Sequence, residues 1–312
     1  MNMSVELESK LSDMEVVDEG MKFKVASVGV SGVDAVLKNG HLAIPCEISG
    51  YPVTQIAQLA FYERKELLAV EVPDSVTSIE RSAFAFCENL SSVKLSSRLV
   101  KIGNRAFSNC YSLQELVIPD SVEIIDEWAF YRCSSLSSLA LPSHLRELRL
   151  GVFSDCKNLE SLVIPGEVSF VDGAVFAGCD NLKSLVVEEG NKRYDSREGC
   201  NAVIETQTNM LVAGCRASFI PEGVTAIGER AFLGCTGMES LIVPDAVREI
   251  GYRAFWDCRD LVSLSIPEHL EDVFLDDDLC TLHDCVKLKS IIVRCQNGRR
   301  RERQNMYYRI SK

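Results

Sequence analysis

The apolar and polar positions of the chain repeat every 23 residues, most cleanly in Leu113–Ser135. Written as a pattern, the unit is L-x-x-L-x-I-P-x-x-V-x-x-I-x-x-x-A-F-x-x-C-x-x. The L-x-I part alternates apolar and polar residues, which predicts a short strand with one buried face. The proline that follows cannot donate a hydrogen bond to a neighbouring strand, so we expect it to end the strand at a turn.

The A-F-x-x-C element recurs in nine copies, counting variants at both ends of the series. The aromatic position holds Phe61, Phe84, Phe107, Phe130, Phe153, Phe176, Phe232 and Phe255, with Leu282 in the last copy. The cysteine position holds Cys87, Cys110, Cys133, Cys156, Cys179, Cys235, Cys258 and Cys285, with Arg64 in the first copy. One unit has too little apolar surface to fold alone, whereas stacked units bury a continuous core. The period therefore predicts a solenoid in which each unit contacts its neighbours.

One interval in the series is longer, because Glu188 and Pro221 occupy equivalent positions 33 residues apart. The added segment contains two apolar runs, Cys200–Ile204 and Met210–Gly214, on either side of the polar run 205–209. Two apolar runs around a polar turn predict a β-hairpin. We interpret it as an elaborated repeat of the same solenoid and not as a linker between domains.

We expect three segments along the chain. Residues 1–50 are predicted to be an acidic segment and a β-rich cap, because 23–50 contain short strand-like runs broken by glycines. Residues 51–295 are predicted to be the solenoid, with the hairpin elaboration at 189–220. Residues 296–312 form a basic tail, with arginines at 299, 300, 301 and 303, and either a short cap or a frayed end is expected there.

Charge and composition exclude several classes of function. The net charge of -12 and the pI near 5.0 repel phosphate backbones, so no nucleic-acid partner is predicted. No apolar run approaches the roughly 18 residues that would span a bilayer, so no membrane insertion is expected. The start of the chain is acidic and lacks the features of a secretory signal, so the chain as written is expected to be cytoplasmic.

The thirteen cysteines suggest disulfides or metal ligation at first sight. Their regular place beside a phenylalanine favours a third interpretation, in which buried free thiols pack as small apolar residues. The one close group of potential ligands is Cys280, His283, Asp284 and Cys285, and the acidic run Asp276–Asp278 lacks the ligand spacing of a calcium loop. We predict no metal site and no cofactor. The four histidines lie in no nucleophile or metal-binding motif, so no catalytic residue is predicted and we expect the chain not to be an enzyme.

These motifs resemble the BspA-like branch of the leucine-rich repeats, known from bacterial surface antigens. The matching features are the 23-residue period, the Ile-Pro step, the A-F-x-x-C element, Gly50–Val53 and the hairpin segment Tyr194–Cys215. The resemblance implies a β-rich solenoid, a right-handed superhelix with a parallel β-sheet on the concave face and short irregular or 3-10 segments on the other. It also implies adhesion to a matrix or cell-surface protein, and a cell-surface or secreted location if a signal was removed.

Outward-facing positions of the predicted strands form two rows. The first row is mainly serine, and the second is apolar in its middle, which is unexpected for residues that face water. The alternative explanation is that β-branched residues favour strands wherever they lie. The predicted partner-binding residues are Val117, Ala140, Val163, Val186, Ile242, Ser138, Ser161 and Ser184.

We therefore expect a non-enzymatic module that binds a protein partner through its strands, as a monomer or with weak self-association. The alternatives are a structural repeat protein that self-associates and an intracellular interaction scaffold. Trp128, Tyr131, Tyr252 and Trp256 flank the A-F elements, where they either form a second contact surface or simply cover the core.

Overall fold

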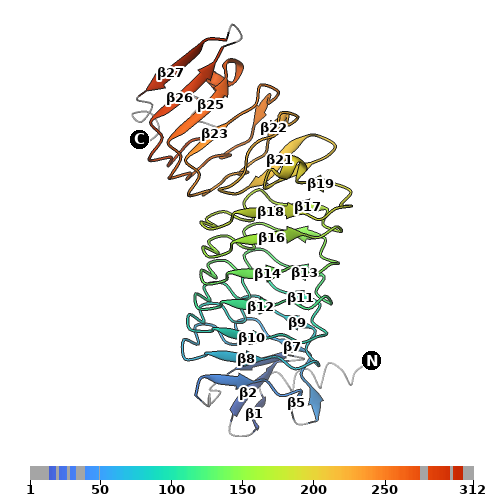
Figure 1. The fold of residues 1–312 in the computed structure, drawn as a ribbon. Coiled ribbons are helices and arrows are strands. Elements are labelled where there is room, and N and C mark those ends of the chain that lie inside the picture. Colours follow the sequence, from blue (N-terminus) through green and yellow to red (C-terminus); the bar gives the residue numbers. More distant parts are fainter. Residues whose placement is uncertain are drawn as a thin grey trace. The chain divides into compact units, whose positions relative to one another are not determined.

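The structure, a computed structural model, describes residues 14–18, 21–26, 29–32, 39–48, 50–274, 280–295 and 298–304. The chain forms two compact units, Met1–Val152 and Phe153–Lys312, which we call unit 1 and unit 2. Within each unit, short strands of consecutive repeats lie side by side and helix is scarce (Figure 1). This confirms the predicted β-solenoid.

The L-x-I segments of unit 1 form parallel strands, and the surface that they present to solvent is called the strand face. These strands are β4 (His41–Ala43), β8 (Ala69–Glu71), β10 (Ser92–Lys94), β12 (Glu115–Val117) and β14 (Ser138–Ala140). β8 pairs in parallel with β4 and β10, and β12 pairs in parallel with β14. Ser92 lies opposite Ala69 and Leu116 opposite Leu139, so the register between repeats reproduces the 23-residue period.

A second sheet of unit 1 contains seven strands in the order β1-β2-β3-β7-β9-β11-β13. They are β1 (Met14–Asp18), β2 (Met21–Ala26), β3 (Gly29–Gly32), β7 (Gln55–Ile56), β9 (Ser78–Ile79), β11 (Lys101–Ile102) and β13 (Ile124–Ile125). β1 to β3 pair antiparallel and β3 to β13 pair in parallel. β5 (Glu47–Ile48) and β6 (Tyr51–Pro52) form an antiparallel pair, and β15 (Glu147–Leu148) is the last strand of unit 1 in sequence.

These two-residue strands alternate with the irregular turns that the sequence analysis expected away from the strand face, in which the Val76 amide donates to Pro73 O at 3.0 Å and the Ala83 amide donates to Glu80 O at 3.2 Å. Between these turns, the backbone of the two-residue strands bonds to the neighbouring repeat. For example, the Glu80 amide donates to Ile56 O at 2.9 Å, and the Gly103 amide donates to Ile79 O at 2.7 Å. Backbone groups that a 3-10 turn would satisfy locally are thus satisfied between repeats.

Unit 2 has the same two kinds of strand. Its strand face is made by β16 (Ser161–Ile164) and β18 (Ser184–Val187), and by the four-stranded sheet of β23 (Ser240–Ile242), β25 (Ser263–Pro267), β26 (Ser290–Arg294) and β27 (Arg300–Gln304). The other strands are β17 (Phe170–Val171), β19 (Tyr194–Asp195), β20 (Ala202–Glu205), β21 (Met210–Gly214), β22 (Ala226–Ile227) and β24 (Glu249–Ile250). The helical segments are η1 (Arg197–Gly199), η2 (Glu268–Leu270) and α2 (Glu271–Phe274).

The long interval in the sequence contains the hairpin of β20 and β21, which pair antiparallel. β21 then pairs in parallel with β22 and so joins the repeat that follows. The turns on either side of the insertion still meet, because the Gly178 amide donates to Gly234 O at 3.2 Å. The hairpin is therefore accommodated within the stack of unit 2.

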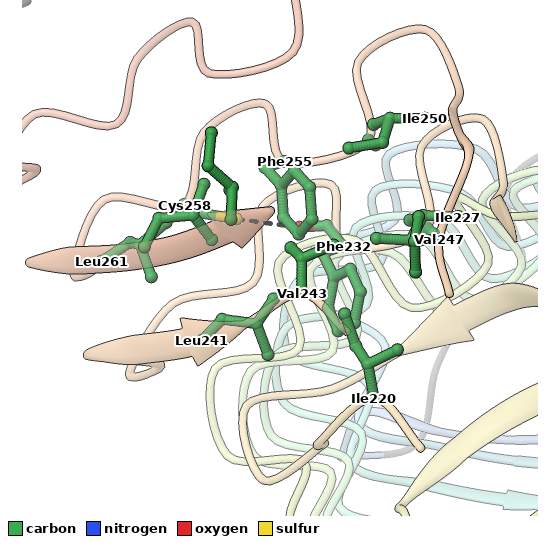
Figure 2. Close-up of a cluster of buried hydrophobic side chains, with 14 of the residues drawn as sticks. Ile220, Ile227, Phe232, Leu241, Val243, Val247, Ile250, Phe255, Cys258 and Leu261 are labelled. Carbon is green, nitrogen blue, oxygen red and sulfur yellow. Dashed lines mark hydrogen bonds between the residues drawn. The ribbon is translucent and has the colours of Figure 1, made fainter. Parts of the chain in front are cut away.

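Phenylalanine rings of the A-F elements stack along the core of each unit. In unit 1 the ring centroids of Phe84 and Phe107 lie 5.3 Å apart, with a 6° angle between the planes. In unit 2 the rings of Phe232 and Phe255 lie 5.3 Å apart, among buried aliphatic side chains such as Leu241 (Figure 2). These rings are fully buried, so they supply much of the apolar surface that holds neighbouring repeats together.

Buried cysteines follow the same spacing as the rings, and several of the thiols donate to a backbone carbonyl of another repeat. Cys110 Sγ donates to Phe84 O at 3.2 Å, in the preceding repeat, and Cys258 Sγ donates to Phe232 O at 3.1 Å. The Phe84 carbonyl also accepts from the Cys87 amide of its own turn. Burial raises the pKa of the Cys87 thiol to about 12 and that of Cys110 well above its ordinary value. The thiols are thus core residues that also bond one repeat to the next.

The basic tail forms a strand where the structure describes it. β27 pairs antiparallel with β26 over five residues. Arg301 contacts Glu268 at 2.9 Å and Glu271 at 3.0 Å, and Arg303 contacts Glu271 at 2.7 Å. Residues 300–304 therefore form the edge strand of the sheet that contains β26.

Candidate binding surface on the strand face

The second outward row of unit 1 contains an exposed apolar side chain on β12. Val117 is 83% exposed, and its register partner on β14 is the exposed Ala140. The first row beside them holds Glu115 and Ser138, which are also exposed. Between the two rows, Leu116 points into the core. The strand alternation therefore places all of the predicted binding residues of unit 1 on the solvent side.

Unit 2 presents a matching pair on β16 and β18. Val163 is 56% exposed and Val186 is 40% exposed, and they are direct partners in the parallel register. Ser161 and Ser184 pair one step earlier in the same strands, Ser161 exposed and Ser184 half-buried. Two exposed valines beside two short hydroxyl side chains make a surface that another backbone can approach closely.

A third part of the strand face lies on the sheet that begins with β23. Ile242 is 63% exposed and pairs with Ser265, which in turn pairs with the half-buried Ile292. Arg294 reaches over this row and donates to Ser265 Oγ at 2.8 Å. The sequence analysis did not single out Arg294, because nothing in its neighbourhood along the chain indicates contact with a residue 29 positions away.

Charged residues occupy the same row at the start of the strand face in unit 1. Glu71 on β8 and Lys94 on β10 are exposed, and their charged atoms lie 4.0 Å apart. The fold therefore accepts polar side chains at this position of the repeat. Strand propensity favours β-branched residues at Val117, Val163, Val186 and Ile242, but threonine is also β-branched, so strand propensity does not require these side chains to be apolar.

The candidate ligand group near the end of unit 2 does not converge on one point. Cys285 Sγ donates inward to Phe255 O at 3.1 Å, whereas the His283 ring stacks on Trp256 with centroids 4.3 Å apart. Asp284 Oδ2 lies 2.9 Å from His283 Nδ1. Among the residues that the structure describes, no three His, Cys, Asp or Glu side chains are grouped to hold a metal ion. The acidic run Asp276–Asp278 lies outside the described residues.

The aromatic residues beside the A-F elements cover turns of the stack. The Arg253 guanidinium lies 4.0 Å from the centroid of the Trp256 ring and 4.7 Å from that of Tyr252. Trp256 also stacks on His283, so several side chains already cover its ring. Trp128 makes an edge contact with Tyr131 at 5.2 Å and lies against Gly151. Sequence reasoning missed the role of Arg253, although an arginine three residues before a tryptophan could have indicated it.

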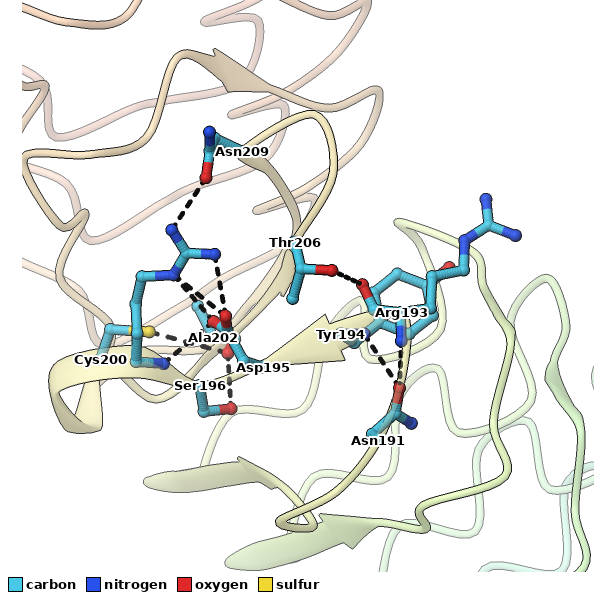
Figure 3. A network of polar contacts seen from close by, with 10 residues as sticks. Asn191, Arg193, Tyr194, Asp195, Ser196, Cys200, Ala202, Thr206 and Asn209 are labelled. Atoms are coloured by element: carbon cyan, nitrogen blue, oxygen red, sulfur yellow. Dashed lines mark hydrogen bonds and ion pairs between the residues drawn. The ribbon is translucent and has the colours of Figure 1, made fainter.

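The polar side chains of the hairpin region in unit 2 form hydrogen bonds with one another and with nearby backbone groups (Figure 3). Arg197 Nε donates to Asp195 Oδ1 at 2.9 Å and Arg197 Nη2 donates to Asp195 Oδ2 at 2.8 Å, while Arg197 Nη1 donates to Asn209 Oδ1 at 2.8 Å. Ser196 Oγ accepts from the Val187 amide and donates to Ala202 O. These contacts fix the hairpin to the neighbouring strand, and no activated nucleophile or acid–base pair is formed among them.

Comparison with known families agrees with this architecture. A family model described as the BspA type leucine-rich repeat region matches residues 54–183 and 214–298 in six copies, which is more than half of the chain. The chain belongs to the BspA-type leucine-rich repeat family. No curated protein sequence matches it. Among the described residues, no helix has the length and the apolar character needed to cross a membrane.

Solved structures of bacterial leucine-rich repeat proteins share the fold. A leucine-rich cell surface protein from Faecalibacterium prausnitzii is 22% identical, with a TM-score of 0.60, and the match covers 92% of this chain and 96% of that one. A leucine-rich repeat protein from Eubacterium ventriosum is 20% identical, with a TM-score of 0.63 and coverage of 90% and 72%. The pneumococcal vaccine antigen PcpA is 20% identical, with a TM-score of 0.60 and coverage of 91% and 88%. At these identities the likeness concerns the fold.

Proposed function

We propose that this BspA-type chain is a non-enzymatic module that binds a protein partner through its strand face. The observation that carries the proposal is the exposed apolar row, Val117 in unit 1 and Val163, Val186 and Ile242 in unit 2. Exposed apolar side chains lose contact with water when a partner covers them, which contributes about 1 kcal/mol or more for each valine. The serines beside them allow close approach and supply hydrogen bonds.

Repeat architecture supports this function on physical grounds. The strand face is built from backbone that is hydrogen-bonded between consecutive repeats, so little conformational entropy remains to be lost on binding. The similarity to a protein described as a cell surface protein supports a location outside the cell, where a matrix or cell-surface protein would be the partner.

The test is a comparison of three forms of the chain in a pull-down from cell lysate and from extracellular-matrix proteins. The strand-face variant carries Val117→Glu, Val163→Glu and Val186→Glu. The control variant carries Val100→Glu, Ile124→Glu and Phe170→Glu, which replace exposed apolar residues that lie outside the strand face. Both variants change the net charge equally, and circular dichroism checks that both are folded.

We expect the pull-down to recover a partner protein with the wild type and with the control variant, but not with the strand-face variant. Equal recovery by all three forms would contradict it, as would loss from the control variant alone. Sedimentation of the wild type in the absence of a partner distinguishes binding of another protein from self-association. A concentration-dependent dimer that the strand-face variant abolishes would replace the proposed partner with a second copy of the chain.

A further inference from the structure

A histidine of unit 2 contacts the neighbouring turn, residues 244–248, through one ring nitrogen. His269, on η2, places Nε2 2.8 Å from Arg248 Nη1 and 2.7 Å from Val247 O. A guanidinium nitrogen only donates, because arginine keeps its proton in proteins, and a carbonyl oxygen only accepts. Nε2 therefore accepts from Arg248 when it carries no proton, and it donates to Val247 O when it carries one. The two hydrogen bonds exclude each other.

The hydrogen bonds of Arg248 favour the first state while the ring is neutral. Arg248 Nη1 also donates to Asp245 O at 2.5 Å and to Val247 O at 3.3 Å, so Val247 O has a donor even when Nε2 accepts from Arg248. A hydrogen bond from a cationic donor is stronger than one from a neutral donor. His269 is exposed, so its other ring nitrogen, Nδ1, can hold the proton of the neutral ring and bond to water.

Charges near the ring determine what a further proton does. The charged side chains of η2, α2 and the turn are Asp245, Arg248, Glu268, Glu271 and Asp272, and those that reach them from β26 and β27 are Arg294, Arg301 and Arg303. Arg301 pairs with Glu268 at 2.9 Å and with Glu271 at 3.0 Å. Among the described residues, Arg248 is the charged group in contact with the ring. Because like charges repel at this short distance, a second proton on the ring separates it from the guanidinium.

The same turn also supports the strand face of unit 2. Asp245 Oδ1 accepts from Arg294 Nη2 at 2.8 Å, and Arg294 Nη1 donates to Ser265 Oγ at 2.8 Å. Ser265 pairs with Ile242, which is exposed on the strand face. A change in the contacts of the turn therefore takes place beside the hydrogen bonds that hold Arg294 over this row.

We propose that His269 is a pH-sensitive switch that holds the Arg248 side chain at neutral pH and releases it in mild acid. In the neutral state Arg248 donates to Nε2. When the ring gains a proton, Nε2 donates to Val247 O, and the guanidinium leaves the ring. Histidine side chains ordinarily gain this proton between about pH 8 and pH 5. The switch does not depend on the proposed binding function, because all of its contacts lie within unit 2.

The position of the proton on the neutral ring is the first test. Long-range ¹H–¹⁵N correlation spectra of the full chain labelled with ¹⁵N-histidine distinguish a proton on Nδ1 from one on Nε2, and the His269→Gln variant identifies the His269 signals. At pH 8 we expect the proton on Nδ1 in the wild type and in the control Arg230→Met, whose guanidinium pairs with Glu229. In Arg248→Met the proton should move to Nε2, because Val247 O is then the remaining partner of Nε2 among the described residues. A proton on Nε2 in the wild type at pH 8 would overturn the proposal.

The mobility of the Arg248 side chain is the second test. The ¹H–¹⁵N nuclear Overhauser effect of its Nε–H group reports fast motion, and it is high for a fixed side chain and low for a mobile one. We expect it to fall between pH 7.5 and pH 5.5 in the wild type and to show no dependence on pH in His269→Gln. Arg197, which donates to both carboxylate oxygens of Asp195, is the control in the same spectra and should stay fixed. Equal values for Arg248 at the two pH values, or a fall that persists in His269→Gln, would show that His269 does not control Arg248.

Discussion

Buried thiols make the stability of this chain sensitive to alkaline pH. Burial raises the pKa of eight cysteines in the folded state, to about 12 for Cys87. The eight are Cys87, Cys110, Cys133, Cys179, Cys200, Cys215, Cys235 and Cys258. In the unfolded chain the same thiols release their protons near pH 9.0. Around and above that pH the folded state holds more protons than the unfolded state, so the stabilisation is complete only well below pH 9.0 and is lost as the pH rises toward the folded pKa.

The size of the effect follows from proton linkage. Each buried thiol destabilises the folded state by about 0.4 kcal/mol at pH 9.0 and about 0.8 kcal/mol at pH 9.5, relative to neutral pH. The six thiols whose pKa rises most, Cys87, Cys110, Cys133, Cys179, Cys235 and Cys258, together give about 2.5 kcal/mol at pH 9.0 and about 5 kcal/mol at pH 9.5, which is comparable with the whole stability of many domains. We therefore expect the free energy of unfolding to fall by several kcal/mol between pH 7.0 and pH 9.5.

Urea unfolding followed by circular dichroism in the presence of a phosphine reductant measures this loss between pH 7.0 and 9.5. The Cys133→Ala variant should be less stable than the wild type at pH 7.0. At pH 9.5 the difference in free energy of unfolding between the two proteins should be smaller by about 0.8 kcal/mol, because the variant has one fewer thiol that folding keeps protonated. Ser154→Ala is the matched control, since it removes a buried donor that bonds to Ala174 O but no thiol. A free energy of unfolding that stays constant to pH 9.5, or a Cys133→Ala gap that does not change with pH, would refute the reasoning.

Three further perturbations test the packing of the stack. Gly151→Ala should destabilise unit 1 by about 2–4 kcal/mol in urea unfolding, because a Cβ there meets the Trp128 ring at a positive φ; an unchanged midpoint would contradict the placement of the indole. Phe107→Ala should cost about 3–5 kcal/mol, since the ring is fully buried in the stack, and Phe107→Leu should cost less. Replacing Arg301 and Arg303 by Gln should speed hydrogen exchange of the β27 amides, as high salt should in the wild type; equal protection would show that the ion pairs do not hold the strand.

Most of the architecture could be predicted from the sequence because the same pattern of apolar and polar residues occurs in every repeat. The register of β8 with β10 and of β12 with β14 equals the 23-residue period, and the position of each Phe and Cys along the period gave its burial correctly. The two-residue strands opposite the strand face were not predicted. The V-x-x-I pattern, with its single buried isoleucine, fits a short strand and a helical turn equally well. The backbone hydrogen bonds that distinguish the two structures connect different repeats.

The features that the sequence did not reveal depend on contacts between residues far apart in the chain. Arg294 bonds to Ser265, and the tail strand β27 depends on Glu268 and Glu271 beyond its own segment. The thiol-to-carbonyl bonds were also missed, because composition indicates burial of a cysteine but not its acceptor. The division into cap, solenoid and tail remains a prediction. So does the binding role of the strand face, since exposure of Val163 does not identify what covers it.

Calorimetric titration tests most directly whether the strand face binds the partner. The recovered partner is titrated with the wild type, with Val163→Glu/Val186→Glu and with Ile124→Glu/Phe170→Glu. We predict that the strand-face change weakens binding about 100-fold or more, because two apolar contacts are lost and two carboxylates would have to be desolvated. The change outside the strand face should leave the affinity within about twofold, which is inside the usual scatter for surface substitutions. Equal affinities of the wild type and the strand-face variant would contradict the claim that this surface binds the partner.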